Sequence, residues 1–165
     1  MSDSLNDQRF LVTGASRGIG KAIALDLASR GAKVAGLATS LGNLSSTQSE
    51  IEAAGGTFLP LAGDISDPQT AIDAVKAVTD AWGGIDGLVA NAGITRDNLL
   101  LRMSADDFNT VIGTNLTGSF HFVKAVTKPM MRQKAGRIVL VGSVAATIGN
   151  PGQANYAASK AGLTG

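Results

Sequence analysis

Five short apolar runs, rich in Val, Ile and Leu, alternate with longer amphipathic stretches along this chain. We expect the runs to form strands at Arg9–Thr13, Lys33–Ala38, Thr57–Leu61, Gly87–Ala90 and Arg137–Gly142. The stretches between them predict helices at Gly18–Arg30, Leu44–Ala54, Pro68–Trp82 and Ala105–Gln133, and the opening turns of another at Gln153–Gly165. Near-continuous apolar strands are typical of a parallel sheet that is buried on both faces. The alternation therefore predicts an α/β fold with right-handed βαβ units and a doubly wound parallel sheet.

The length indicates one folded domain over residues 1–165. The chain is 44% apolar and 16% charged, and it contains no repeat or linker. Such a composition fits a globular domain with its own core. Nucleotide-binding sheets of this kind usually have about six strands, so we expect the domain to be incomplete at its C-terminus and to lack its last strands. The alternative is that the last helix simply frays.

Charge and residue types exclude several classes of function. Fourteen basic and thirteen acidic residues leave a formal charge of +1, too little to favour a nucleic-acid partner. Without Cys, and with one His, a metal site is not expected. We interpret His121, which lies between Phe120 and Phe122, as structural. Residues 1–8 lack the features of a signal peptide, and no apolar run approaches the length of a membrane span. We therefore expect a cytoplasmic protein with no membrane partner.

The first expected strand leads into a glycine-rich turn, and a helix follows. Gly14 permits a tight turn, while Gly18 and Gly20 let the backbone and the helix N-terminus approach a pyrophosphate. A turn without a ligand is the alternative, but the strand–turn–helix context favours a dinucleotide site in a Rossmann-like fold. The predicted cofactor-binding residues of this turn are Gly14, Ser16, Arg17, Gly18, Ile19 and Gly20.

The end of the second strand indicates which dinucleotide binds. NAD enzymes usually have a carboxylate there for the ribose 2′-hydroxyl, whereas this chain has Thr39 and Ser40 and no acid until Glu50. Both hydroxyls can donate to a 2′-phosphate, and Arg17 can supply a positive charge. We therefore predict NADPH as the cofactor, although Arg17 could instead be a solvated surface charge.

Tyr156 and Lys160 form the most specific pair in the sequence. Spaced four residues apart on a helix, they lie on one face. A nearby ammonium favours the phenolate, so Tyr156 can exchange a proton with a carbonyl oxygen. Ser143 follows the fifth strand, where an α/β sheet binds ligands, and its hydroxyl can orient that carbonyl. Asn115 lies within the long predicted helix, where Asn is a poor helix former. Taken singly, Ser143 could be a turn serine and Asn115 an exposed surface residue.

The glycine spacing G-x-x-x-G-x-G after Thr13, together with the order Asn115, Ser143, Tyr156 and Lys160, resembles the short-chain dehydrogenase/reductase family. The resemblance implies that these four residues are catalytic, that Asn115 holds a water linking Lys160 to solvent, and that Tyr156 and Lys160 also contact the cofactor. It implies that Asp64 and the Ile65 backbone hold the adenine, although Asp64 could instead cap the next helix. The ribose would lie along Asn91, Ala92 and Gly93, within a family motif whose first Asn is replaced here by Ala90.

Three segments resemble one group of the family, the 3-oxoacyl-[acyl-carrier-protein] reductases. They are Gly36–Ser40, Gly93–Leu100 and Gly152–Lys160. This likeness implies an oxidoreductase of fatty acid biosynthesis that reduces a 3-oxoacyl thioester with NADPH, with acyl-carrier protein as partner and a tetramer as the full-length assembly. An acidic carrier would need a basic docking surface, and we expect candidates near the end of the long helix at Lys124, Lys128, Arg132, Lys134 and Arg137. A solvated helix face is an equal alternative for them.

Other functions stay open at this point. The chain could reduce 3-oxoacyl-CoA or another small ketone, or it could be a non-catalytic NADPH-binding fragment. The complete set of four catalytic residues favours an enzyme. The sequence does not indicate the acyl-chain length, the direction of the reaction in the cell, or whether this chain folds and assembles by itself.

Overall fold

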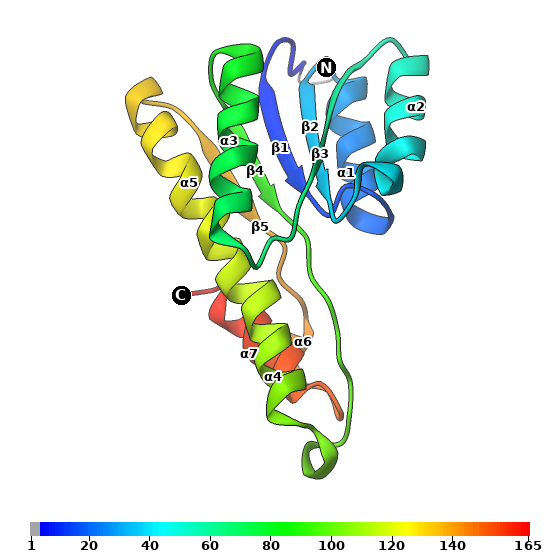
Figure 1. Ribbon diagram of the computed structural model, residues 1–165, viewed down its shortest axis with the longest axis vertical. Coiled ribbons are helices and arrows are strands. Elements are labelled where there is room, and N and C mark those ends of the chain that lie inside the picture. The colour runs from blue at the N-terminus through cyan, green and yellow to red at the C-terminus, as the bar shows by residue number, and fades with distance from the viewer. Residues whose placement is uncertain (1–3) are drawn as a thin grey trace.

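The computed structural model describes residues 4–165 and contains a five-stranded parallel sheet flanked by helices (Figure 1). The strand order is β3-β2-β1-β4-β5. The strands are β1 (Arg9–Thr13), β2 (Lys33–Ala38), β3 (Thr57–Ala62), β4 (Gly87–Ala90) and β5 (Arg137–Leu140). The predicted α/β class and parallel sheet are confirmed, and every strand begins at the expected residue. Only two ends differ, because β3 continues to Ala62 and β5 stops at Leu140.

The helices largely follow the predicted ranges. They are α1 (Gly18–Ser29), α2 (Ser45–Ala53), α3 (Pro68–Trp82), α4 (Ala105–Ile112), α5 (Gly118–Gln133), α6 (Ala145–Ile148) and α7 (Ala154–Gly162), with 3₁₀ turns η1 (Leu41–Leu44) and η2 (Leu100–Arg102). Asp67 caps α3 by accepting from the Gln69 N–H at 2.9 Å, and Pro68 is its first residue. α5, the longest, has 16 residues, and within residues 4–165 no helix is long and apolar enough to cross a membrane.

The single helix predicted over Ala105–Gln133 is wrong in one respect. A π-helical segment, η3 (Gly113–Thr117), separates α4 from α5. Asn115 lies within η3, and its side chain bonds to the backbone of Ile94 in the loop after β4. π-helical turns are frequent at functional sites. Because a helix-interior Asn competes for backbone hydrogen bonds, the irregular segment coincides with the residue that sequence reasoning found out of place.

Two apolar cores cover the two faces of the sheet. Leu11 and Leu88 pack with Phe122 in the core covered by α3 and α5. Their neighbours Val12 and Val89 belong to the other core, under α1 and α2. Successive strand residues point to opposite faces, so continuous apolar runs supply both cores at once.

The expectation that all strands are buried on both faces is wrong for β5. Its residues Ile138 and Val139 are 40% and 54% exposed. β5 is an edge strand whose sole neighbour is β4 in the sheet of residues 4–165. The apolar run at residues 137–142 therefore predicts the strand correctly but not its burial.

Figure 1 shows two parts, a sheet covered by helices and a helical segment that projects beyond it. We call the sheet with α1, α2, α3 and α5 the body. We call residues 93–117 and 141–165, which include α4, η3, α6 and α7, the arm. The arm extends beyond the carboxyl ends of the strands, in the lower half of Figure 1. Parallel pairing brings those strand ends together, so the body and the arm meet where ligands bind in open α/β sheets.

Candidate active site

The glycine turn after β1 adopts the backbone that its sequence predicts. Gly14 and Gly18 have φ values of 68° and 55°, in the left-handed region that favours glycine. A side chain at Gly20 would lie 2.1 Å from the carbonyl oxygen of Gly14. The turn can therefore bring α1 this close to the strand only if position 20 has no side chain.

The first turn of α1 is open to a negatively charged ligand. Arg17 makes no side-chain capping bond to this helix, and no acidic residue lies in its first turn. The N–H groups at a helix N-terminus lack intrahelical partners, and the helix dipole favours an anion there. Ile19 is 63% exposed beside them. These residues fit a dinucleotide pyrophosphate, which Gly14, Ser16, Gly18, Ile19 and Gly20 would hold.

The ends of β1 and β4 are locked together by hydrogen bonds. The Thr13 hydroxyl accepts from the backbone N–H groups of Asn91 and Ala92, both at 3.0 Å. The Asn91 side chain returns a bond to the Thr13 carbonyl at 3.1 Å. Thr13 was not among the predicted site residues, although its place before the glycine turn was the available signal. These bonds hold the segment from Asn91 to Gly93 beside the glycine turn.

The predicted residues after β2 and β3 also lie at the carboxyl ends of the strands. None of them lines the hollow that is described in the next paragraph. Thr39 and Ser40 are exposed, and the Thr39 hydroxyl accepts from the Asn43 side chain at 3.0 Å. Asp64 is exposed and accepts from the N–H and the hydroxyl of Ser66. Asp64 thus closes a turn and does not cap α3, while Ile65 beside it is buried. Their contacts with a cofactor stay predictions.

A hollow of about 440 Å³ opens where the body meets the arm. Its lining comes from the glycine turn, the segments after β4 and β5, and α7. The lining residues are Arg17, Ile19, Asn91, Gly93, Ile94, Thr95, Val141, Gly142, Tyr156 and Lys160. A second hollow, of about 370 Å³, lies between α1 and α2 at the opposite sheet edge and contains none of the predicted site residues. The first hollow is therefore the candidate active site.

Tyr156 and Lys160 lie in the hollow on one face of α7. The Lys160 ammonium is 5.9 Å from the centre of the Tyr156 ring and donates to the Val141 carbonyl at 2.7 Å. Lys160 is 5% exposed, and burial lowers the pKa of its ammonium. The Tyr156 hydroxyl has no hydrogen-bond partner among residues 4–165, so it is available to a ligand.

Ser143 lies next to the hollow without lining it. Its hydroxyl accepts from the N–H of Ala145, the first residue of the short helix α6, at 3.2 Å. Because the oxygen acts as the acceptor there, the hydroxyl proton is free to donate. Within the described chain no hydrogen bond joins Ser143 to Tyr156 or Lys160.

Asn115 is completely buried, so the alternative that it is an exposed surface residue is wrong. Its side-chain oxygen accepts from the Ile94 N–H at 2.8 Å, and its amide donates to the Ile94 carbonyl and the Ser159 hydroxyl at 3.0 Å each. These bonds use both amide hydrogens and one of the two acceptor sites of the side-chain oxygen. The backbone carbonyl of Asn115 accepts from the Ser119 hydroxyl at 2.7 Å. The water expected at Asn115 stays a prediction.

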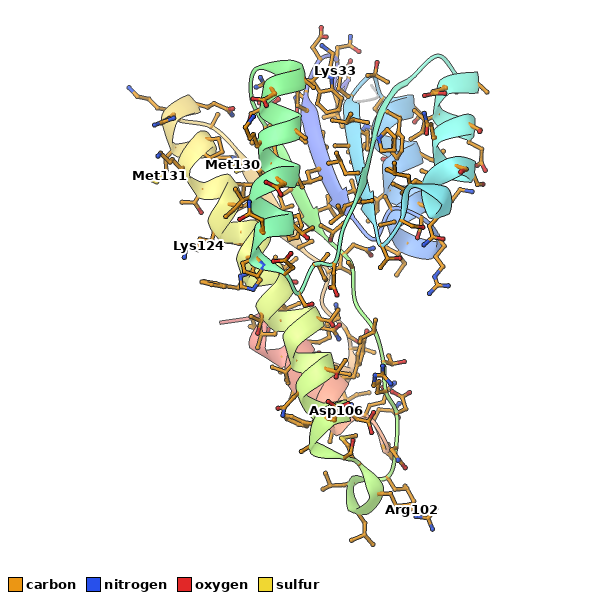
Figure 2. All side chains as sticks on the ribbon, in the orientation of Figure 1. Lys33, Arg102, Asp106, Lys124, Met130 and Met131 are labelled. Carbon is orange, nitrogen blue, oxygen red and sulfur yellow. The ribbon has the colours of Figure 1, made fainter. Side chains whose placement is uncertain are left out.

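None of the basic residues of α5 lines this hollow within the same chain. α5 begins beside the arm and ends near the amino edge of the sheet, where Gln133 bonds to Ile85. Figure 2 shows Lys124 partway along α5 and Arg102 at the opposite end of the molecule, at the tip of the arm. The basic cluster near the end of α5 therefore contributes no residue to the hollow of its own chain. His121 lies in α5 outside the hollow, with its ring 5.8 Å from that of Phe120.

Comparison with known proteins gives consistent matches. The family model for short chain dehydrogenases matches residues 8–165. The 3-oxoacyl-[acyl-carrier-protein] reductase FabG of Vibrio cholerae is 53% identical over 162 residues, which are 98% of this chain and 65% of the relative. The enzyme of the same name from Escherichia coli K12 is 52% identical over 94% of this chain and 62% of the relative.

A solved structure agrees with these relatives. The crystal structure of a Sinorhizobium meliloti 1021 protein, assigned to the short-chain alcohol dehydrogenases, superimposes with a TM-score of 0.94 and 37% sequence identity. The match covers 97% of this chain and 64% of the other. The chain thus spans just under two thirds of the length of the proteins that it matches.

Proposed function

Since this chain belongs to the short-chain dehydrogenase family, we propose that it carries the nucleotide-binding and catalytic part of a reductase that converts a 3-oxoacyl thioester into its 3-hydroxyacyl form. The main support for this proposal is that the glycine turn and the Tyr156–Lys160 pair line the same hollow. A phosphate cradle and a proton donor in one site are what the reduction of a carbonyl by a dinucleotide requires.

We propose NADPH as the nicotinamide nucleotide. Arg17 lines the hollow, and the residues after β2 include no carboxylate that would repel a 2′-phosphate. When bound, this cofactor supplies the hydride. A bidentate guanidinium is well suited to a phosphate, and hydroxyl groups at Thr39 and Ser40 can add donors.

The chain's own residues then handle the substrate carbonyl and its proton. The free hydroxyl of Tyr156 donates the proton that the reduced oxygen needs. Lys160 lies close behind its ring, and because burial lowers the pKa of this ammonium, it releases a proton more readily than an exposed lysine does. The unshared proton of Ser143 can bond to the carbonyl and orient it.

We further propose an acyl-carrier protein as the bearer of the substrate, in cytoplasmic fatty acid biosynthesis, and a homo-oligomer as the full-length assembly. The names of the relatives from V. cholerae and E. coli support the carrier. Reduction of 3-oxoacyl-CoA is the second candidate, since both thioesters present the same reacting group.

One assay tests this proposal. NADPH oxidation is followed with a 3-oxoacyl thioester attached either to acyl-carrier protein or to CoA, and NADH replaces NADPH in a parallel series. We expect the highest kcat/KM with NADPH and the carrier thioester. A higher kcat/KM with CoA would favour the second candidate. NADPH binding without oxidation on either thioester would contradict the reductase function.

A further inference from the structure

Part of the lining of the hollow belongs to the loop after β4. Ile94 and Thr95 of this loop line the hollow together with Tyr156 and Lys160, and we call them the Ile94–Thr95 wall. Residues 91–99 form neither helix nor strand, and farther along the loop Leu99, Leu100 and Leu101 are 60%, 73% and 98% exposed. Packing of those three side chains therefore does not hold the loop in place, so its hydrogen bonds are the anchors to consider.

Two completely buried amides supply these bonds. Asn115 binds both polar backbone groups of Ile94. Asn155, the residue before Tyr156, donates from its side-chain nitrogen to the Arg96 carbonyl at 2.8 Å. Thr95 is thus held between two peptide groups that are each bound to a buried side chain. Asn115 is one of the predicted catalytic residues, but Asn155 is not.

Asn155 connects three elements. Besides Arg96 in the loop, its amide nitrogen lies 3.4 Å from the Asp107 carbonyl in α4. Its oxygen accepts from the N–H of Tyr156 at 2.7 Å, in the first turn of α7. This N–H is one of the backbone donors that a helix start leaves without an intrahelical partner. One side chain therefore fixes both the start of the catalytic helix and the loop that faces it.

Two further bonds link this loop to the residues just before α7. Gln153 donates to the Asp97 carboxylate at 2.9 Å, and the Asn98 N–H donates to the Gly152 carbonyl at 2.9 Å. The Gln153–Asp97 bond is exposed, so water competes for its partners, whereas a buried amide that loses a partner stays unsatisfied. Among the residues that link this loop to the start of α7, we therefore expect Asn155 to have the greatest effect on the geometry of the hollow.

We propose that Asn155 is a positioning residue, which sets the distance between the Ile94–Thr95 wall and the Tyr156 hydroxyl through its bonds to the Arg96 carbonyl and the Tyr156 N–H. The proposal rests on the function proposed above. Asn155 acts through the loop and the helix and does not line the hollow itself. Its removal should therefore lower kcat and raise the KM for the thioester while the glycine turn keeps its affinity for NADPH.

An Asn155→Asp variant separates the hydrogen bond from the shape of the side chain. The aspartate keeps an oxygen for the Tyr156 N–H but points a second oxygen at the Arg96 carbonyl. Burial raises the pKa of a carboxyl group, so mildly acidic pH restores an O–H that can donate to this carbonyl. We expect kcat to fall about tenfold or more at mildly alkaline pH and to recover as pH falls, because orientation errors are costly in catalysis.

Two further variants complete the series. Asn155→Ser can still accept from the Tyr156 N–H but cannot reach Arg96, and we expect a loss of kcat that acid does not restore. Asn150→Asp makes the same chemical change at an exposed side chain that bonds to Gln153 at 2.9 Å. This control should keep the kcat, the KM and the pH profile of the wild type. An Asn155→Asp profile that matches the control would overturn the proposal.

Amide hydrogen exchange tests the same point without turnover. In Asn155→Asp at mildly alkaline pH we expect faster exchange at the Ile94 and Asn98 N–H groups, which bond to Asn115 and Gly152, and unchanged exchange in β1 and β4. Unchanged exchange in the loop, or faster exchange throughout the sheet with loss of NADPH binding, would overturn the positioning role. If the wild type binds NADPH without turnover, the proposed function fails, and exchange alone decides this inference.

Discussion

The body buries Leu11, Leu37 and Leu88 between layers of helix and sheet, whereas the arm buries Asn115, Asn155 and Ser159. Equally buried side chains thus make apolar contacts in the body and hydrogen bonds in the arm. Apolar burial is non-directional and mainly stabilises the fold, while hydrogen bonds hold groups at defined distances and angles. The difference teaches that apolar packing dominates in the sheet and helices of the body, whereas buried hydrogen bonds carry more of the structure of the arm.

Large apolar side chains are also exposed at the surface of the arm. In the arm, Leu101 is 98% exposed, Val144 is 72% exposed and Ile148 is 76% exposed. A region with few apolar contacts opens locally at low free energy. Substitutions in the body should therefore change the free energy of unfolding, and substitutions in the arm should change turnover.

Tyr156→Phe should have the largest effect on turnover and should separate turnover most clearly from the free energy of unfolding. Removal of a general acid costs about a hundredfold to ten-thousandfold in rate. The hydroxyl has no partner within residues 4–165, so the free energy of unfolding should change by less than about 0.5 kcal/mol. Steady-state rates and thermal unfolding of the same preparation check both values. Near-normal turnover would show that another group donates the proton.

Leu88→Ala should destabilise the body strongly. Leu88 is completely buried in the core between the sheet, α3 and α5, and large-to-small changes at such sites cost about 2–5 kcal/mol. Leu101→Ala in the arm is the matched control and should stay within about 0.5 kcal/mol of the wild type. Urea unfolding measures both. Equal losses in the two variants would mean that the arm is packed as firmly as the body.

Asp86→Asn should weaken a partly buried ion pair between Arg9 in β1 and Asp86, the residue before β4. The Arg9 guanidinium bonds to the Asp86 carboxylate at 2.7 and 2.8 Å and holds its pKa below the ordinary value. This pair stabilises the fold above the ordinary pKa of aspartate, and the contribution is lost as pH falls through the lowered pKa. We expect a loss of about 1–3 kcal/mol at neutral pH.

The pH dependence supplies the control for this substitution. Urea midpoints of the wild type and Asp86→Asn should converge in acid, because the wild-type carboxyl is then protonated. A difference in midpoint that is independent of pH would show that the effect is not electrostatic.

Arg17→Ala should give the smallest effect of the four substitutions, a loss of affinity for NADPH. Loss of one guanidinium contact with a 2′-phosphate should weaken NADPH binding about tenfold, or about 1.4 kcal/mol. NADH binding should not change, because NADH has no such phosphate. Titration with each nucleotide measures the two dissociation constants. An equal loss for NADH would assign Arg17 to the pyrophosphate or to the fold.

The sequence predicts the body better than the arm, for a physical reason. Continuous apolar runs and the cap at Asp67 are local signals, and all five strand starts agree with the structure. The same signals cannot reveal whether other elements cover the faces of a strand, so they did not predict the exposure of β5. The π-helical turn at Asn115 depends on a bond to Ile94, 21 residues away in the sequence.

The candidate site shows the same limit. The residues of the glycine turn, Tyr156 and Lys160 are found from spacing, and the hollow brings Arg17, Tyr156 and Lys160 together. Asn155 was missed because its partners, Arg96 and Asp107, are loop and helix residues 59 and 48 positions away. Buried polar networks of this kind follow from tertiary contacts, which a single sequence does not display.

The thermal midpoint of this chain with excess NADPH, with excess NADH and without nucleotide tests the central claim most directly. A ligand that binds only the folded state raises the midpoint. If the body carries a formed NADPH site, the midpoint should rise with both nucleotides, and more with NADPH than with NADH. A cooperative transition that neither nucleotide shifts would contradict the account, because the glycine turn would then be a structural feature without its ligand.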